Sequence, residues 1–88
     1  MDIENLILVW DDFNKEHLKK HSVSVKEVEE SCHNILGKFQ AKNDRFLLIG
    51  KAKNGRVISM IVAIKGSQSI YIVTARDTSK NEKNHIKI

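Results

Sequence analysis

The dipeptide Asn54-Gly55 constrains the fold of this chain more than any other local feature. It stands between two apolar, β-prone runs, residues 45–51 and 56–65. Asparagine and glycine both tolerate a positive φ, which a tight turn between two strands requires. We therefore predict that the two runs form neighbouring antiparallel strands, with the start of one strand beside the end of the other.

Weaker signals complete the pattern of expected elements around this hairpin. Apolar runs predict three further strands, at residues 5–10, 35–41 and 69–75. Helix starts are marked where a side-chain oxygen can accept an orphan backbone N–H, at Asp11 or Asp12, at Ser24, and at Thr78 or Ser79. The last two starts also carry capping boxes, which pair Ser24 with Glu27 and Ser79 with Glu82.

The resulting order, β-α-α-β-β-β-β-α, predicts a small α+β domain with a mainly antiparallel sheet. We expect the two N-terminal helices to pack on one face of the sheet and to leave the other face partly open. A short helix is expected near the C-terminus. A chain of 88 residues can bury one compact core, so residues 1–88 are predicted to form a single domain.

Apolar spacing indicates which helix residues face the sheet. Near-helical spacing in the first helix, which is expected to end at about His21, favours inward positions for Phe13, for His17 or Leu18, and for His21. In the second helix the apolar stripe consists of Val25, Val28 and Cys32. Trp10, at the end of the first strand, is expected to pack in the core rather than to stack on a base.

Charge is divided unequally along the chain. Residues 1–40 carry eight acidic side chains and five lysines, a formal charge of −3. Residues 41–88 carry ten basic and three acidic side chains, a formal charge of +7, which together with the first segment gives the +4 of the whole chain. A segment this basic suits a polyanion such as RNA, although lysine-rich surfaces also serve solubility alone.

Targeting signals are not evident in the sequence. No apolar run approaches the roughly 20 residues needed to span a bilayer, and Leu6–Trp10 is too short for a signal peptide. Cys32 is the only cysteine, so no internal disulfide is possible. These features predict a cytoplasmic protein without a membrane partner.

Common nucleotide, zinc and hydrolase signatures, such as GxGxxG, HExxH, CxxC and GxSxG, do not occur in the sequence. His17 and His21 have the i, i+4 spacing of metal ligands, and Cys32 and His33 follow on the next helix. Such a set could hold a metal, but the two pairs lack the spacing of a zinc finger, so we predict neither metal nor cofactor. The two helix histidines could instead carry protons near neutral pH.

Arginine is rare in this lysine-rich chain, and each of the three falls at the end of a predicted strand: Arg45, Arg56 and Arg76. The planar guanidinium fork stays charged and binds two phosphate oxygens at once, which favours phosphate contacts. The alternative is a surface ion pair, for instance with Asp44 or Asp77.

Taken in order, the motifs of nearly the whole chain resemble the BrnT toxin family of bacterial type II toxin–antitoxin systems. They are Trp10-Asp11, Lys19-Lys20-His21 followed by Ser22-Val23, Val25-Lys26-Glu27-Val28, Asp44-Arg45-Phe46-Leu47-Leu48-Ile49-Gly50, Gly55-Arg56-Val57-Ile58, and Val73-Thr74-Ala75-Arg76 with Glu82 beyond. The resemblance implies a RelE-like fold and a metal-independent endoribonuclease that inhibits translation. It also implies an antitoxin partner that covers the toxin and joins it on promoter DNA.

The same resemblance suggests site residues. The candidate catalytic arginines are Arg45, Arg56 and Arg76, of which Arg76 and either Arg45 or Arg56 would bind the scissile phosphate. His17 or His21 would act as base or acid if they face the open side of the sheet. If they face the core, an arginine, a lysine such as Lys51, or Tyr71 must take over with lower efficiency. The residues expected to contact RNA are Lys51, Lys53, Tyr71 and Lys80.

The first helix departs from the family pattern, which usually has a lysine followed by an asparagine and a Lys-His-Gly triplet. The comparable residues here are Asn14, His17 and Lys20-His21-Ser22. The alternative hypothesis is therefore a non-catalytic module that binds RNA or a protein partner.

Overall fold

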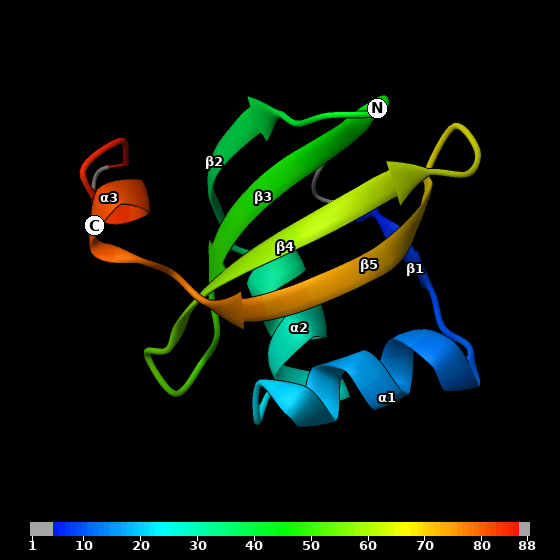
Figure 1. Ribbon diagram of the computed structural model, residues 1–88, viewed down its shortest axis with the longest axis horizontal. Helices are drawn as coiled ribbons and strands as arrows, with labels where there is room; N and C mark the ends of the chain where they lie inside the picture. The colour runs from blue at the N-terminus through cyan, green and yellow to red at the C-terminus, as the bar shows by residue number, and fades with distance from the viewer. Residues whose placement is uncertain (1–4, 87–88) are drawn as a thin grey trace.

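The computed structural model describes residues 5–86 of the chain and contains the elements in the expected order (Figure 1). They are β1 (Ile7–Val9), α1 (Asp12–Lys20), α2 (Val25–Cys32), β2 (Ile35–Gln40), β3 (Arg45–Lys51), β4 (Val57–Ile64), β5 (Ser69–Asp77) and α3 (Lys80–Lys83). The prediction of an α+β fold with a mainly antiparallel sheet is confirmed. None of the described helices has the length and apolar character required to cross a membrane.

Side-chain caps fix where the helices begin. Asp11 accepts a hydrogen bond from the backbone N–H of Asn14 at 2.9 Å, and Asn14 accepts one from the backbone N–H of Asp11 at 2.9 Å. Capping boxes of the same kind open α2 at Ser24 and α3 at Ser79, as predicted. The buried Asn14 also donates to the carbonyl of Val9 at 2.9 Å, which ties the end of β1 to the start of α1.

The sheet has five strands in the order β1-β5-β4-β3-β2. Strands β2 to β5 form an antiparallel meander, and the Asn54-Gly55 turn joins β3 to β4 as predicted, with Gly55 at a φ of 91°. β1 adds to the outer edge of β5 in parallel. Local signals do not predict this pairing, because β1 and β5 lie about sixty residues apart in the sequence.

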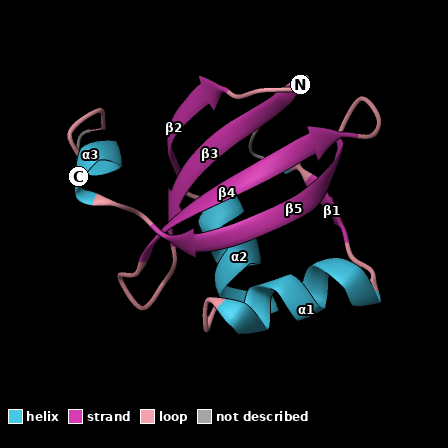
Figure 2. Ribbon diagram, in the orientation of Figure 1, coloured by secondary structure: helices cyan, strands magenta, loops and turns pink. Residues whose placement is uncertain are grey.

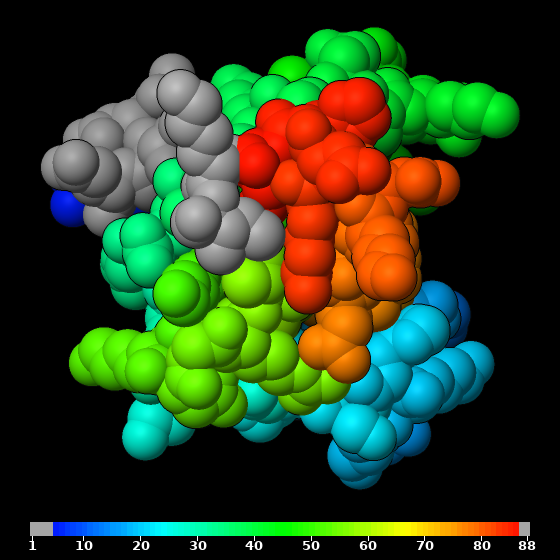
Figure 3. Space-filling model, turned by 90° about the vertical axis from the view of Figure 1, so that its left-hand side faces the viewer, coloured from blue at the N-terminus to red at the C-terminus, as the bar shows by residue number. Residues whose placement is uncertain are grey.

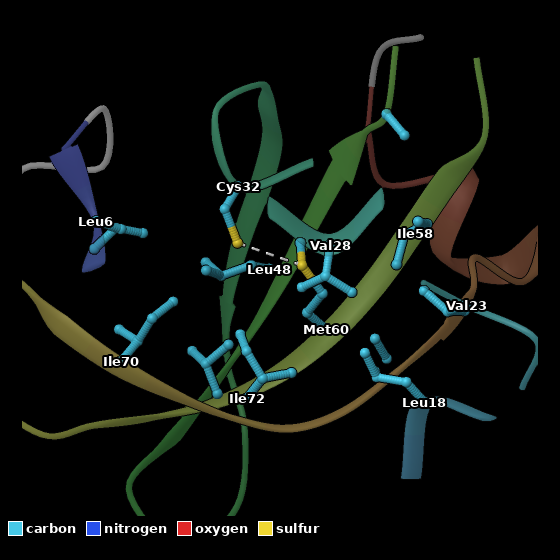
Figure 4. Packing of buried hydrophobic residues seen from close by; sticks show 13 residues of the cluster. Leu6, Leu18, Val23, Val28, Cys32, Leu48, Ile58, Met60, Ile70 and Ile72 are labelled. Atoms are coloured by element: carbon cyan, nitrogen blue, oxygen red, sulfur yellow. Dashed lines mark hydrogen bonds between the residues drawn. The ribbon is translucent and has the colours of Figure 1, made fainter. Parts of the chain in front are cut away.

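Two helices cover one face of the sheet: α1 packs beside β5, and α2 packs behind β3 and β4 (Figure 2). The core between them and the sheet includes Leu18, Val28, Met60 and Ile72 (Figure 4). Burying such side chains is worth roughly 1.5–3 kcal/mol each. Trp10 packs against this core, as expected.

The inward positions predicted for α1 are partly wrong. Leu18 is buried, but Phe13 is 74% exposed and His21 is exposed. The physical reason is the capping box at Asp11, which turns Asn14 toward the core, so that the buried face runs through Asn14 and Leu18, four residues apart. In α2 the prediction is confirmed, since Val28 and Cys32 are buried and Val25 packs against the core.

The opposite face of the sheet, which we call the open face, is covered only at one end by the residues that the structure describes. There α3 and the residues after it lie beside β2, as the space-filling view shows in red and green (Figure 3). The close approach needs Gly37, where a Cβ would come within 2.7 Å of the Ile86 side chain. Strand alternation places Arg45, Leu47, Ser59, Tyr71 and Arg76 on the open face. The two-layer arrangement therefore leaves most of this face accessible.

Candidate functional site

Four of the predicted site residues share the open face: Arg45, Lys51, Tyr71 and Arg76. In the register of the sheet, Arg45 and Tyr71 both lie opposite Ala63, at one end of the sheet. Arg76 lies opposite Ser59, four residues farther along β4, or roughly 13 Å at 3.3 Å per residue. Arg45 and Arg76 are therefore on one surface, but they are too far apart to bind one phosphate.

Arg76 forms a two-point ion pair with Glu82 of α3. Its Nη1 donates to Glu82 Oε1 at 2.7 Å and its Nη2 donates to Oε2 at 2.8 Å. The pairing raises the pKa of Arg76 and holds the pKa of Glu82 at about 2, where the N–H of Ser79 and the hydroxyl of Ser59 also contribute. The carboxylate of Glu82 thus binds the guanidinium of Arg76, the group predicted to bind phosphate.

Arg45 differs from the other two arginines. Its side chain is exposed, and within residues 5–86 no hydrogen bond or ion pair is found for its guanidinium group. It lies in one row with Tyr71, whose hydroxyl donates to Asp11 at 3.1 Å. Partial burial, followed by this hydrogen bond, raises the pKa of Tyr71. Arg45 is free to meet an anion without breaking a contact.

Arg56 immediately precedes β4, in the turn that follows β3, and its guanidinium contacts residues of the helix side. It donates from Nε and Nη2 to Asp77 at 2.6 and 3.2 Å, and from Nη1 to the Ser22 carbonyl at 2.7 Å and to Glu27 at 3.2 Å. Its Nη2 also reaches the carbonyl of His21 at 3.3 Å. A guanidinium has five N–H donors, and the contacts just named engage all five.

We call this arrangement the Arg56 clamp: Arg56 with Glu27, Asp77 and the carbonyls of His21 and Ser22. It joins the end of α1, the start of α2 and the end of β5, which meet on the side of the molecule seen in Figure 3. The geometry gives Arg56 a structural task that leaves no donor free for a phosphate. Of the two interpretations of this arginine, the ion pair with Asp77 is the one realised.

The carboxylates of the clamp are held in their charged form. The backbone N–H of Ser24, the amide of Asn54 and then Arg56 lower the pKa of Glu27 to about 2. The hydrogen bond from Arg56 lowers the pKa of Asp77 as well. Hydrogen bonding to the charged form outweighs the cost of partial burial in both groups.

Acid is expected to destabilise the fold between about pH 4.5 and about pH 2. Glu27 and Glu82 have folded-state pKa values of about 2 against an ordinary value of 4.5, so the unfolded chain takes up protons first. Their contribution is complete above pH 4.5 and declines as the pH falls through this window. The midpoint of urea unfolding, measured from pH 7 to pH 2, tests this. Glu27→Gln or Glu82→Gln should make the curve of midpoint against pH flatter. Glu16→Gln, at an exposed pair with Lys19, should leave the curve unchanged.

The two helix histidines lie on the helix layer and not on the open face. His17 stacks on the exposed Phe13 with ring centroids 5.6 Å apart, beside a surface hollow of about 390 Å³. His21 caps the end of α1 with its side chain exposed and its carbonyl on Arg56. Because α1 packs on the opposite side of the sheet, neither imidazole faces Arg45 or Arg76. Their predicted use as base or acid on the open side does not fit this geometry.

Cys32 does not meet these histidines, so the metal alternative has no site in this arrangement. Its thiol lies in the core, 3.5 Å from the sulfur of Met60 (Figure 4), and burial, with a smaller contribution from Glu29, raises its pKa to about 12. A thiol held protonated is a poor ligand and a poor nucleophile. Within residues 5–86, no group of three or more His, Cys, Asp or Glu side chains is arranged to hold a metal ion.

The remaining predicted RNA contacts lie at the margins of the sheet. Lys51 ends β3 on the open face and is half-buried. Lys53 is exposed in the turn before β4, where its backbone N–H donates to Glu30 at 3.1 Å. Lys80 is exposed at the start of α3. Lys51 is at the opposite end of β3 from Arg45, Lys53 follows that end in the turn, and Lys80 begins α3, so the three lysines form no compact cluster with Arg45.

His85 is a candidate that sequence reasoning missed. It lines a cavity of about 60 Å³ on the open face together with Phe39, Leu47, Ile49 and Glu82. No motif in the sequence singles out His85. The available signal was its spacing of three residues from Glu82, which puts both on one side of a helical turn. The structure thus brings a histidine to the side of the Arg76–Glu82 pair.

Comparison with protein-family models and with curated protein sequences finds no match for this chain. The arguments for its function therefore rest on the residues of the open face.

Proposed function

We propose that this chain is a RelE-like toxin of the BrnT type, a metal-independent endoribonuclease that binds RNA on the open face of its sheet. The observation that carries the proposal is the common face of Arg45, Lys51, Tyr71 and Arg76, which come from two strands and are not covered by α1 or α2. A sheet face that combines cations with aromatic and apolar side chains suits single-stranded RNA, because the bases can stack while the phosphates meet the cations.

Apolar side chains lie among these cations. Phe39 and Leu47 pair across β2 and β3 and line the small cavity beside Glu82. Arg45 and Arg76, roughly 13 Å apart along the strand direction, would bind different phosphates of one strand. The phosphate nearest Arg76 is the one we propose to be cleaved, because His85 lies on that side.

Cleavage without a metal requires a base for the ribose 2′-OH and cations for the charge that grows on the phosphate. In the proposed reaction the 2′-oxygen attacks the adjacent phosphorus, His85 accepts its proton, and the bond to the 5′-oxygen breaks. A 2′,3′-cyclic phosphate forms, and the 5′-oxygen takes a proton from solvent. Arg76 stabilises the phosphoryl charge, and His85 replaces His17 and His21 as the proposed base.

His85→Gln is expected to lower RNA cleavage about 100-fold, the lower end of what a positioned general base contributes. His33→Gln, at the exposed end of α2, is the matched control and should cleave RNA like the parent protein. The measurement is the cleavage rate of a labelled RNA by purified protein, with thermal unfolding checked for each variant. Full cleavage by His85→Gln, or its loss in His17→Gln or His21→Gln, would refute the assignment.

Arg45→Ala gives a separate test of the binding face. Because the Arg45 guanidinium is exposed, its removal should leave the fold intact and weaken RNA binding, with a smaller dependence on salt. RNA affinity that stays the same at every salt concentration would place the RNA elsewhere.

A non-catalytic RNA-binding or partner-binding module is the second candidate. Two observations favour it. All donors of Arg56 are engaged within the protein, and Arg76 is ion-paired with Glu82. The two functions separate in one assay: a catalytic toxin produces RNA fragments with 2′,3′-cyclic ends, whereas a binding module shifts RNA without cutting it. Growth arrest on expression, relieved by the adjacent open reading frame, would identify the proposed antitoxin partner.

A further inference from the structure

Four hydrogen-bond donors converge on the carboxylate of Glu82. Arg76 contributes two, at 2.7 and 2.8 Å. The Ser59 hydroxyl lies 3.0 Å from Oε1, and the backbone N–H of Ser79 lies 2.9 Å from the same oxygen. We call these donors, from Arg76, Ser59 and Ser79, the cradle. A guanidinium fork with additional donors is the arrangement that proteins use for phosphate as well as for carboxylate.

Two residues of the cradle, Ser59 and Arg76, belong to the sheet, whereas Ser79 caps α3, the helix that carries the occupant. Ser59 and Arg76 are directly opposite each other on β4 and β5. Ser59 is only 1% exposed, and its hydroxyl oxygen lies 2.9 Å from that of Thr78, which is also buried. Glu82 comes instead from α3, a helix of four residues that buries none of its members. Donors held largely by the sheet therefore bind an acceptor that is carried on a short helix.

We propose that the cradle is an anion-binding site and that Glu82 occupies it as an internal stand-in for a phosphodiester phosphate of RNA. The inference rests on the proposed function for the identity of the phosphate, but not for the existence of the site. RNA enters the cradle when the Glu82 side chain turns out of it, which frees Arg76 while the backbone of α3 and the neighbouring His85 stay in place. Glu82 thereby lowers the apparent affinity of the open face for RNA.

Glu82 competes as an anion at neutral pH, since its pKa is held at about 2. An internal competitor acts at a high effective concentration, so it lowers the apparent affinity for any external phosphate. Glutamine at position 82 keeps the shape of the side chain and the capping role of this position, because Gln serves in a capping box as Glu does. Glu82→Gln therefore removes the charge while preserving the start of α3.

The first experiment titrates inorganic phosphate into the full chain and follows the amide signals of Ser59 and Ser79 and the Nε signal of Arg76 by NMR. Glu82→Gln is expected to bind phosphate at least about tenfold more tightly than the parent protein, because the internal competitor is gone. Glu16→Gln, which removes an exposed carboxylate on α1, is the matched control and should behave like the parent.

The double variant Glu82→Gln/Arg76→Gln should lose the gain in phosphate binding. A gain that persists in the double variant, or no gain in Glu82→Gln, overturns the inference. Thermal unfolding of each variant shows whether it is folded. If the double variant does not fold, Glu82→Gln/Arg76→Lys replaces it, since lysine keeps the charge but loses the fork, and it should bind phosphate more weakly than Glu82→Gln.

The same variants titrated with a short single-stranded RNA separate this inference from the proposed function. Tighter binding of both phosphate and RNA by Glu82→Gln supports both. If Glu82→Gln binds phosphate more tightly but no variant binds RNA, the anion-binding site is supported and the ribonuclease proposal is refuted. If the parent and Glu82→Gln bind RNA equally, and RNA changes the NMR signals of residues other than Ser59 and Ser79, the role of Glu82 is refuted while RNA binding by the protein stands.

Discussion

Gly50→Ala is expected to destabilise the protein by about 3 kcal/mol or more, because overpacking against a rigid neighbour has few ways to relax. Gly50 lies on β3 where α2 crosses the sheet. A Cβ there would collide with the backbone carbonyl oxygen of Ser31 and would lie 2.8 Å from its carbonyl carbon. The obstacle is the main chain of α2, so no side-chain rotation can relieve it. The whole helix would have to move away from β3 and β4.

Gly66→Ala is the matched control for this substitution. Gly66 lies in the turn between β4 and β5, and the nearest atoms to an added Cβ are 3.7 Å away on Ser69. Its effect should stay within about 0.5 kcal/mol. Urea unfolding can be followed through the fluorescence of Trp10, the only tryptophan. A Gly50→Ala protein as stable as Gly66→Ala would show that α2 does not approach β3 as closely as the structure has it.

Arg56→Met is expected to cost about 2 kcal/mol, because it removes several charge-assisted hydrogen bonds and leaves a carboxylate without its cation. The Glu27 side chain is only 18% exposed, so solvent compensates poorly for the loss. Asp77 is 67% exposed and loses less. Arg56→Lys should recover only part of the stability, since one ammonium group cannot reach Asp77, Glu27 and the Ser22 carbonyl in the same fork geometry.

Arg45→Ala is the arginine control in the same unfolding experiment, and its effect should stay within about 0.5 kcal/mol because its guanidinium is exposed. The Arg56 series also decides between two tasks for that residue. A clamp residue loses stability in parallel with any loss of RNA cleavage. An Arg56→Met protein that is as stable as the parent and yet fails to cleave RNA would return Arg56 to the phosphate-binding set.

The sequence alone does not distinguish the task of Arg56 from that of Arg76. Arg56 and Arg76 both stand at strand ends in a basic segment, and both have the chemistry for phosphate. Arg76 meets Glu82 only six residues along the chain, whereas the carboxylates that Arg56 meets, Asp77 and Glu27, lie 21 and 29 residues away. Glu27 is placed beside Arg56 by the packing of α2, and no local pattern reports that distance.

The histidines illustrate the same division. The i, i+4 spacing of His17 and His21 is a helical property and is visible in the sequence. A shift of about one residue in the buried face of α1 turns both imidazoles away from the core, and the packing of α1 under β5 keeps them off the open face. His85 reaches that face only because the chain after β5 folds back over β2 at Gly37.

Local chemistry was sufficient for the parts of this protein that are formed by neighbours in the sequence. The Asn54-Gly55 turn, the capping boxes at Ser24 and Ser79 and the strand periods are decided within a few residues, so local patterns predict the order of the elements and a mainly antiparallel sheet. The folded chain adds the pairing of β1 with β5 and the contacts by which Arg56 joins the two helices. Each of those depends on contacts between distant segments, whose free energy comes from burial and charge pairing that no local pattern encodes.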